Sequence, residues 1–219
     1  AFIGQDGSGK STVTDEILEW LSWKLDANKF YLGSGEHFHS WQKKLKKKII
    51  YKKKYKFVTI ISALLTLSNH MSVAKRTYKF VNQGKRYALN GGIAIFDRYP
   101  QTIHFGINDG PKIRFNYLDR INNPLLKKIV LYCAKVEENY LAKAERAVPE
   151  IVFKLILPPE ISIIRKPKEN FELIKIKHEI IKSLSFTQTK VYSIDVTQEY
   201  IEEIEEIKKL IWGRLLKHK

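Results

Sequence analysis

The stretch Gly4-Gln5-Asp6-Gly7-Ser8-Gly9-Lys10-Ser11-Thr12 decides which fold this chain is expected to adopt. Its first eight residues match the phosphate-binding pattern G-x-x-x-x-G-K-[ST] in full. The apolar residues 1–3 before it are typical of the end of a buried strand, and residues 11–25 after it carry apolar side chains at helical spacing. A strand, a glycine-rich turn and a helix in this order predict a P-loop that binds a nucleoside triphosphate.

Each part of the motif has a physical role. The glycines let backbone N–H groups converge on phosphate oxygens without a side-chain clash. The helix that follows directs its positive end at the same anion. We expect Lys10 to reach the β- and γ-phosphates and the hydroxyl of Ser11 to ligate Mg²⁺.

The rest of the chain alternates apolar strands with helices. Strands are predicted at residues 29–32, 93–96, 151–157 and 190–194, and mainly helical segments at residues 41–81, 125–147, 160–183 and 198–217. Residues 90–92 (Asn-Gly-Gly) break the first long helical segment, and residues 111–124 are expected to be irregular. This alternation predicts one three-layer α/β domain, residues 1–219, around a parallel sheet.

The composition is that of a soluble globular protein, with 44% hydrophobic and 28% charged residues. The longest apolar run, residues 57–67, is shorter than the about 20 residues that span a bilayer, so we expect a buried helix there. The single cysteine, Cys133, cannot form an internal disulfide, and we expect it to be buried and inert. Because the first residues are typical of a core strand rather than a secretory signal, we expect a cytoplasmic protein.

A second candidate site begins at Asp97, directly after the apolar run at residues 93–96. Ligands bind at the carboxyl ends of the strands in open parallel sheets. Asp97 is therefore a candidate to hold Mg²⁺ or to orient the acceptor, and Arg98 to clamp an anionic acceptor or transition state. The alternative is a strand-end cap with a surface salt bridge.

These motifs resemble those of thymidylate kinases and their relatives. Residues 2–12 are similar to the opening of those enzymes, and Asp97-Arg98-Tyr99 to the triplet after their third strand. Residues 157–166 resemble the strand, helix and arginine that lead into the family's lid, and residues 192–195 its last strand. The resemblance implies a nucleoside-monophosphate-kinase-like P-loop NTPase fold with a five-stranded parallel sheet. It also implies ATP and Mg²⁺ as cofactors, and an acceptor held by Arg98 beside Tyr99.

The segment after the second strand departs from that family. Thymidylate kinases carry Arg-Glu-Pro-Gly-Gly there, whereas this chain has residues 33–38, Gly-Ser-Gly-Glu-His-Phe. The chain looks more like a divergent branch found beside bacterial surface-polysaccharide genes, with Asp-Arg-Tyr-Pro at 97–100 and Asp-Gly-Pro at 109–111. Glu36 and Trp41 also have the spacing of the general base and tryptophan of deoxynucleoside kinases. A base at Glu36 would deprotonate a nucleoside or sugar hydroxyl.

A basic turn follows the fourth predicted strand and contains Arg165, Lys166 and Lys168. In this kinase class a lid, expected here at about residues 162–172, folds over the phosphates and neutralises the charge that develops during transfer. Arg165 is the candidate catalytic residue of the lid. The alternative is an ordinary solvated basic turn.

Nine lysines and no acid lie between Lys43 and Lys56, within a basic segment at residues 41–56, and supply more than half of the formal net charge of +16. They are interpreted as a solvated helix face, as a contact with an anionic membrane surface, or as a contact with nucleic acid phosphates. Nucleic acid binding has no supporting motif, so we expect none.

Together these features predict a kinase that transfers the γ-phosphoryl group of ATP to a nucleoside monophosphate such as dTMP. The first alternative is a nucleoside or sugar hydroxyl kinase with Glu36 as base. The second is a non-catalytic ATP-binding module at a membrane or partner enzyme. Related kinases often pair through apolar helices like residues 57–67, so a homodimer is also predicted.

Overall fold

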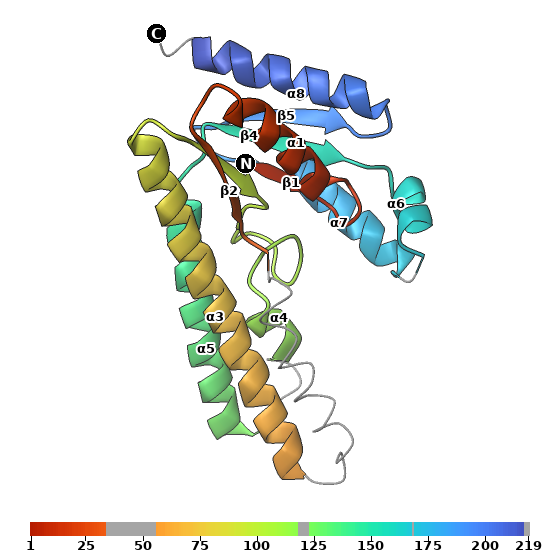
Figure 1. Cartoon of the computed structure of the whole chain (residues 1–219). Helices are drawn as coiled ribbons and strands as arrows, with labels where there is room; N and C mark the ends of the chain where they lie inside the picture. The colour runs from red at the N-terminus through yellow and green to blue at the C-terminus, as the bar shows by residue number, and fades with distance from the viewer. Residues whose placement is uncertain (34–55, 118–122, 168, 217–219) are drawn as a thin grey trace. The chain divides into compact units, whose positions relative to one another are not determined.

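The computed structural model describes residues 1–33, 56–117, 123–167 and 169–216 (Figure 1). The chain forms two compact units, each made of separate segments. Unit 1 comprises Ala1–Phe30, Gln83–Tyr99 and Ala147–Lys219, and unit 2 comprises Tyr31–Asn82 and Pro100–Arg146. The prediction of a single domain over residues 1–219 stays a prediction, as do the interpretations of the lysines between Lys43 and Lys56, most of which lie outside the described residues.

A five-stranded parallel sheet is built into unit 1 and confirms the predicted fold class. Its strands are β1 (Phe2–Gly4), β2 (Ala27–Tyr31), β3 (Ile93–Asp97), β4 (Ile151–Ile156) and β5 (Lys190–Asp195). They lie in the order β2-β3-β1-β4-β5, with Phe2 opposite both Asp97 and Phe153. After β1 the chain forms β2 and β3 on one side of this central strand, and then β4 and β5 on its other side. The carboxyl end of β1 is therefore the topological switch point, which is where open α/β sheets bind ligands.

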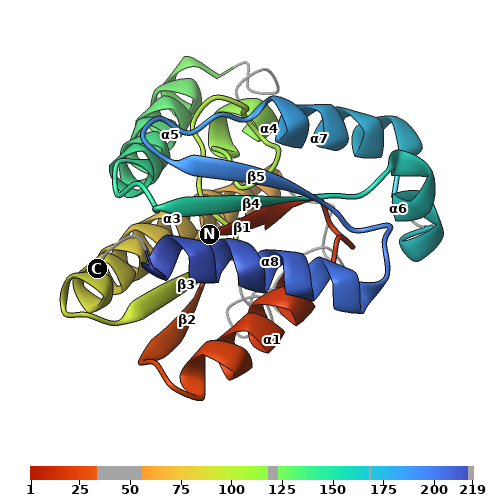
Figure 2. The same ribbon diagram turned by 90° about the horizontal axis from the view of Figure 1, so that it is seen from above.

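Helices cover both faces of this sheet. They are α1 (Lys10–Ser22), α6 (Pro159–Arg165), α7 (Phe171–Ser183) and α8 (Tyr200–Leu215). Figure 2 shows α1 and α8 side by side on one face and α7 on the other. This arrangement of helix, sheet and helix confirms the predicted three layers.

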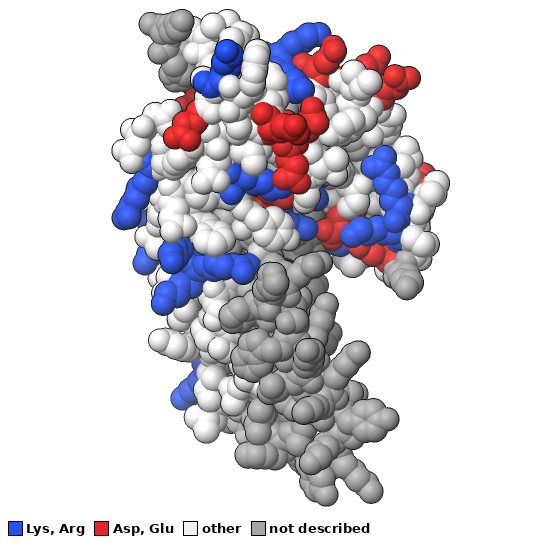
Figure 3. Space-filling view, in the orientation of Figure 1, with Lys and Arg blue, Asp and Glu red and all other residues white. Residues whose placement is uncertain are grey.

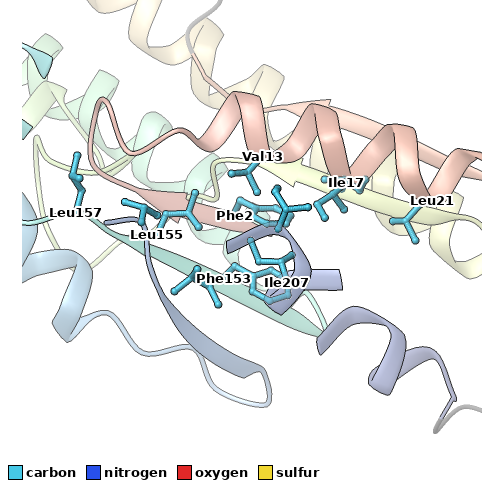
Figure 4. Close-up of a cluster of buried hydrophobic side chains, with 12 residues drawn as sticks. Phe2, Val13, Ile17, Leu21, Phe153, Leu155, Leu157 and Ile207 are labelled. Carbon is cyan, nitrogen blue, oxygen red and sulfur yellow. The ribbon is translucent and has the colours of Figure 1, made fainter. Parts of the chain in front are cut away.

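The core of unit 1 lies between the sheet and the helices α1 and α8 (Figure 4). Val13, Ile17 and Leu21 project from α1 at four-residue spacing and are buried with the side chains of β1 and β4. The helix ends at Ser22 and not at the predicted Leu25, whose side chain is partly exposed. The chain turns there to enter β2, so an apolar side chain past Leu21 no longer faces the sheet.

Unit 2 is helical in the part that the structure describes. α3 (Lys56–Leu89) starts in unit 2 and its last residues belong to unit 1, while α4 (Ile113–Tyr117) and α5 (Pro124–Glu145) lie wholly in unit 2. α3 continues past Val81, where the predicted helical segment stopped, and ends at Asn90-Gly91-Gly92, which confirms the predicted break; Gly91 adopts a φ of 91° there. The irregular segment predicted at residues 111–124 contains α4. Leu67, Ile113, Val130, Cys133 and Ala134 form the core of this unit.

The structure bears on two predictions made from the composition, one about Cys133 and one about membrane-spanning helices. Cys133 is buried, and burial raises the pKa of its thiol, as expected for an inert cysteine. Of the helices that the structure describes, none combines the length and the apolar character needed to cross a bilayer.

Candidate active site

The P-loop links β1 to α1 at the carboxyl end of the sheet. Gly7 and Gly9 have φ values of 88° and 83°, the left-handed region that favours glycine. Among the described side chains none caps the N-terminus of α1, so its first backbone N–H groups remain available to an anion. The buried ammonium of Lys10 donates to the carbonyl oxygens of Gly4 at 2.8 Å and Gln5 at 2.6 Å. The loop therefore has the backbone conformation of a phosphate cradle, with its lysine held inside it.

Other residues of the motif support the loop. The buried side chain of Gln5 donates a hydrogen bond to the carbonyl oxygen of Leu157, just after β4. Ser8 is also buried, and its backbone N–H donates to the carbonyl oxygen of Gln5 at 3.2 Å. Thr12 is exposed on the first turn of α1. Gln5 and Ser8 thus hold the shape of the loop by interactions within the protein.

Asp97 and Ser11 are in contact where the P-loop ends and α1 begins. The hydroxyl of Ser11 donates to Oδ2 of Asp97 at 2.9 Å, although the two residues are 86 positions apart. Asp97 is 1% exposed, and its Oδ1 is buried without a hydrogen-bond partner in the described part of the chain. A buried carboxylate oxygen with unused acceptor capacity beside a hydroxyl fits Mg²⁺, which prefers oxygen ligands and is held by few protein groups at phosphate sites.

Lys29 of β2 is a member of this site that sequence reasoning missed. Its ammonium lies 3.5 Å from Oδ2 of Asp97 and 2.8 Å from Oδ1 of Asp15. β2 is the neighbour of β3 in the sheet, which brings Lys29 to Asp97. The only sign of this role in the sequence was a lysine within a short apolar strand. That sign did not show that Asp97 would be its partner.

The carboxylate of Asp6, in the P-loop, forms ion pairs with two basic side chains. Its carboxylate lies 3.4 Å from Nη2 of Arg98 and 3.3 Å from the ammonium of Lys177, which also contacts Glu169 at 3.3 Å. Burial alone would raise the pKa of Asp6, but Lys177, Arg98 and Lys10 together lower it to about 2. Arg98 adopts a φ of 77°, which is uncommon for a residue with a side chain. The network holds Arg98 against the P-loop, and Lys177 on α7 is a second member that the sequence did not reveal.

The predicted lid arginine also reaches the P-loop. Nη1 of Arg165, the last residue of α6, donates to the carbonyl oxygen of Gly7 at 3.0 Å. The end of α6 passes so close that a Cβ on Gly7 would lie 3.8 Å from the Cβ of Arg165. Lys168 lies outside the described residues. The structure therefore brings Lys10, Ser11, Asp97, Arg98 and Arg165 together around one loop.

Two predicted acceptor residues have a different outcome. Tyr99 is 1% exposed, its ring packs against Phe96 and Phe186, and its hydroxyl donates to the carbonyl oxygen of Ala147 at 2.6 Å. Tyr99 therefore packs in the interior of unit 1, and its contact with a substrate stays a prediction. Glu36 lies outside the described residues, so its role as base stays a prediction.

Unit 2 contains a cavity of about 110 Å³ that is lined by both polar and apolar side chains. The polar residues of its wall include Asn69 and His70 of α3, Asp109 and Lys112 between β3 and α4, and Glu137 of α5. Asn69 is 7% exposed, and its Oδ1 is buried with no hydrogen-bond partner among the residues that the structure describes. A buried amide oxygen left unsatisfied at a cavity wall indicates a place for a hydrogen-bond donor from a ligand.

Glu137 shapes one wall of this cavity. Its Oε2 accepts hydrogen bonds from the backbone N–H groups of Lys112 at 3.1 Å and Ile113 at 2.8 Å. Burial raises the pKa of its carboxyl group, although these two hydrogen bonds oppose the effect. The Asp-Gly-Pro motif adds Asp109 and Gly110 to the lining. A Cβ on Gly110 would lie 2.0 Å from the carbonyl oxygen of His104, so only glycine fits there.

Comparisons with known proteins agree with this fold. No protein-family model matches the chain. It is 26% identical over 222 residues to the uncharacterized ATP-binding protein YghR of Escherichia coli K12, and the match covers 96% of this chain and 85% of that protein.

Solved structures of deoxyadenosine kinase from M. mycoides share the fold. The structure with bound dATP has a TM-score of 0.50 at 18% identity and covers 96% of this chain and 97% of that one. The structure with the products dCMP and a flexible dCDP has a TM-score of 0.50 at 17% identity and covers 97% of both chains. The finer resemblance to thymidylate kinases stays a prediction.

Proposed function

We propose that this protein is an ATP-dependent kinase that transfers the γ-phosphoryl group of ATP to a nucleoside. The observation that carries the proposal is the pair formed by Ser11 and Asp97 beneath a P-loop that Lys10 and Arg165 also contact. Phosphoryl transfer needs positioning and charge neutralisation more than covalent chemistry, and these residues supply both. The ATP-binding relative and the two deoxyadenosine kinase structures support the same activity.

The chain's own residues would act as follows. The backbone N–H groups of the P-loop and of the first turn of α1 bind the phosphates. Lys10 exchanges its two carbonyl partners for phosphate oxygens, and Arg165 moves from the carbonyl of Gly7 to the transferred group. Ser11 and Asp97 would hold Mg²⁺, which neutralises phosphate charge when it is bound. Arg98 stays near the loop through its ion pair with Asp6.

The acceptor proposal rests on the cavity in unit 2. Among the described residues its charged side chains are one lysine, Lys112, and two carboxylates, Asp109 and Glu137, so this part of the lining has no excess of positive charge. Such a wall suits an uncharged ring with donors and acceptors better than a phosphate group. Pro100 also lines the cavity and follows Asp97-Arg98-Tyr99 directly in the chain, which supports a role in the same reaction. We therefore favour a nucleoside over the nucleoside monophosphate expected first.

A hydroxyl acceptor needs a base, and Glu36 is the proposed one. Glu36→Gln should abolish transfer to a hydroxyl and only weaken transfer to a phosphate, because a phosphate acceptor is already ionised. The experiment is Mg·ATP turnover, measured as ADP release, against nucleosides, nucleoside monophosphates and sugars. Release that depends on a nucleoside and disappears in Glu36→Gln supports the proposal. Release that depends only on a monophosphate refutes it in favour of the thymidylate-kinase-like alternative.

A variant of the cavity tests the acceptor site separately. Asn69→Leu keeps a similar volume but removes the unsatisfied amide oxygen. We expect the KM for the nucleoside to rise about tenfold or more while the KM for ATP stays the same, since one lost hydrogen bond in a buried site costs about 1–2 kcal/mol. An unchanged nucleoside KM would remove the cavity from the proposal. ATP binding without turnover by any acceptor would instead favour the non-catalytic module.

A further inference from the structure

Three of the four tryptophans of the chain line one groove on unit 1. The groove has a volume of about 380 Å³ and lies between the end of α1, with the residues just after it, and the second half of α8. Trp20 and Trp212 meet edge to face with ring centroids 6.3 Å apart. Trp23 is 78% exposed and Trp212 is 48% exposed. Large apolar side chains gathered at one exposed groove mark an interaction site.

Lysines form the polar part of the same groove. Lys24 lies over the ring of Trp23 at 4.6 Å, and Lys208 over the ring of Trp20 at 5.8 Å. Lys209 is the third, and among the described residues no acidic side chain lines the groove. Glu16 and Glu205 pair with Lys208 and Lys209 from outside it, at 3.2 Å and 4.0 Å. In Figure 3 acidic side chains gather over the other, N-terminal end of α8, so within the lining itself the charged groups are all lysines.

The hydrogen-bonding character of the lining selects the ligand. Ammonium groups and indole N–H groups only donate hydrogen bonds. They can therefore satisfy phosphate oxygens, which only accept. A peptide would bring backbone N–H groups as well as carbonyls, and burying those N–H groups without acceptors would be costly. Indole rings also partition to the boundary between lipid headgroups and acyl chains.

The position of the groove leaves the nucleotide site open. α1 begins at the P-loop and runs for 13 residues, about 20 Å at the rise of an α-helix, before it reaches the groove. The groove therefore lies at the amino edge of the sheet, whereas the P-loop lies at the carboxyl edge (Figure 1). A flat partner can cover the groove while ATP enters and leaves.

We propose that this tryptophan–lysine groove docks unit 1 onto an anionic phospholipid bilayer. The indoles of Trp23 and Trp212 enter the headgroup region, and Lys24, Lys208 and Lys209 contact lipid phosphates. The contact is peripheral and reversible, since each lysine near an anionic surface contributes about 1 kcal/mol. It is distinct from any contact through the lysines between Lys43 and Lys56.

The test is binding of the full chain to sucrose-loaded vesicles by sedimentation. Vesicles of phosphatidylcholine alone are compared with vesicles that also contain phosphatidylglycerol. We expect binding that depends on phosphatidylglycerol and weakens by about tenfold or more in Trp23→Ala/Trp212→Ala, because two exposed indoles no longer bury apolar surface. Trp23→Ala alone should weaken it several-fold, and this side chain is too exposed to matter for folding. Leu89→Ala, which removes another exposed apolar side chain of unit 1, should bind like the wild type.

Fluorescence identifies the surface that touches the lipid. In a Trp41→Phe background the tryptophan emission comes from the groove alone. Lipids with brominated acyl chains should quench it, and Trp23→Ala/Trp212→Ala should remove most of the quenching. Failure of the wild type to bind anionic vesicles would overturn the proposal. Binding that is equally strong in the double variant would also overturn it, because the lysines between Lys43 and Lys56 would then suffice.

Discussion

Glu203 provides a prediction whose size follows from the structure. This residue of α8 is 5% exposed, and no described residue forms a hydrogen bond with its buried Oε1. Burial raises the pKa of its carboxyl group from 4.5 to about 7, with Asp195 and Glu206 adding to the shift and Arg165 opposing it. The native protein thus keeps a proton on Glu203 in a pH range where the unfolded chain has lost it.

The sign and size of the effect follow from linkage. Between pH 4.5 and pH 7 the unfolded state binds fewer protons at this site than the native state, so stability falls as the pH rises. At about 1.4 kcal/mol per pKa unit, the free energy of unfolding should lose on the order of 2–3 kcal/mol between pH 5 and pH 8 through this one group. Glu203→Gln keeps the neutral hydrogen-bonding form at every pH and removes this loss.

The assay is urea unfolding of the wild type and Glu203→Gln at pH values from 5 to 8, followed by tryptophan fluorescence. The two proteins should have similar stability at pH 5, and the variant should be more stable by about 2–3 kcal/mol at pH 8. Glu202→Gln, at an exposed position of the same helix and not among the causes of this shift, serves as the control, and its difference from the wild type should stay constant across this pH range. A difference between wild type and Glu203→Gln that stays constant across this range would refute the reasoning.

Three further predictions concern stability. Ile207→Ala removes a fully buried side chain between α8 and the sheet, and should lower the free energy of unfolding by about 2–5 kcal/mol in a denaturant titration. Asn123→Ala removes the side chain that accepts from the N–H groups of Leu125 and Leu126, and should cost about 1 kcal/mol, measured in the same way. Asp6→Asn should destabilise the protein above pH 4 but progressively less as the pH falls towards 2. The reason is that the folded pKa of Asp6 is about 2 and its ordinary value 3.8, so its contribution is present above the ordinary pKa and is lost through the folded one.

The parts of the fold that are determined by residues close together in the sequence could be predicted. The P-loop is one continuous stretch, and its strand, turn and helix are each visible in local apolar spacing. The parallel sheet followed from apolar runs that alternate with helices. Asp97 was identified because the residue after a buried strand must lie at the carboxyl edge of the sheet. Arg165 was identified by the resemblance of residues 157–166 to the strand, helix and arginine that lead into the lid of thymidylate kinases.

The parts that depend on strand order and helix packing could not be predicted. Lys29 reaches Asp97 only because β2 lies next to β3, and Lys177 reaches Asp6 only because α7 packs beside the P-loop. Asn69 and Glu137 line a cavity formed by segments far apart in the chain. Tyr99 was assigned to the acceptor site because it adjoins Arg98 in the motif, and that assignment stays a prediction. In the structure Arg98 turns towards Asp6, while Tyr99 points into the interior.

Transfer of ³²P from γ-labelled Mg·ATP to a deoxynucleoside tests the central claim most directly. We expect a labelled nucleoside monophosphate as product, and a loss of rate of at least about a hundredfold in Lys10→Ala and in Asp97→Asn, because each removes charge at the transferred group or its metal. Lys24→Ala, at the far end of α1, is the matched control and should retain the wild-type rate. Absence of labelled product with every nucleoside, or transfer that survives both site variants, would contradict the account.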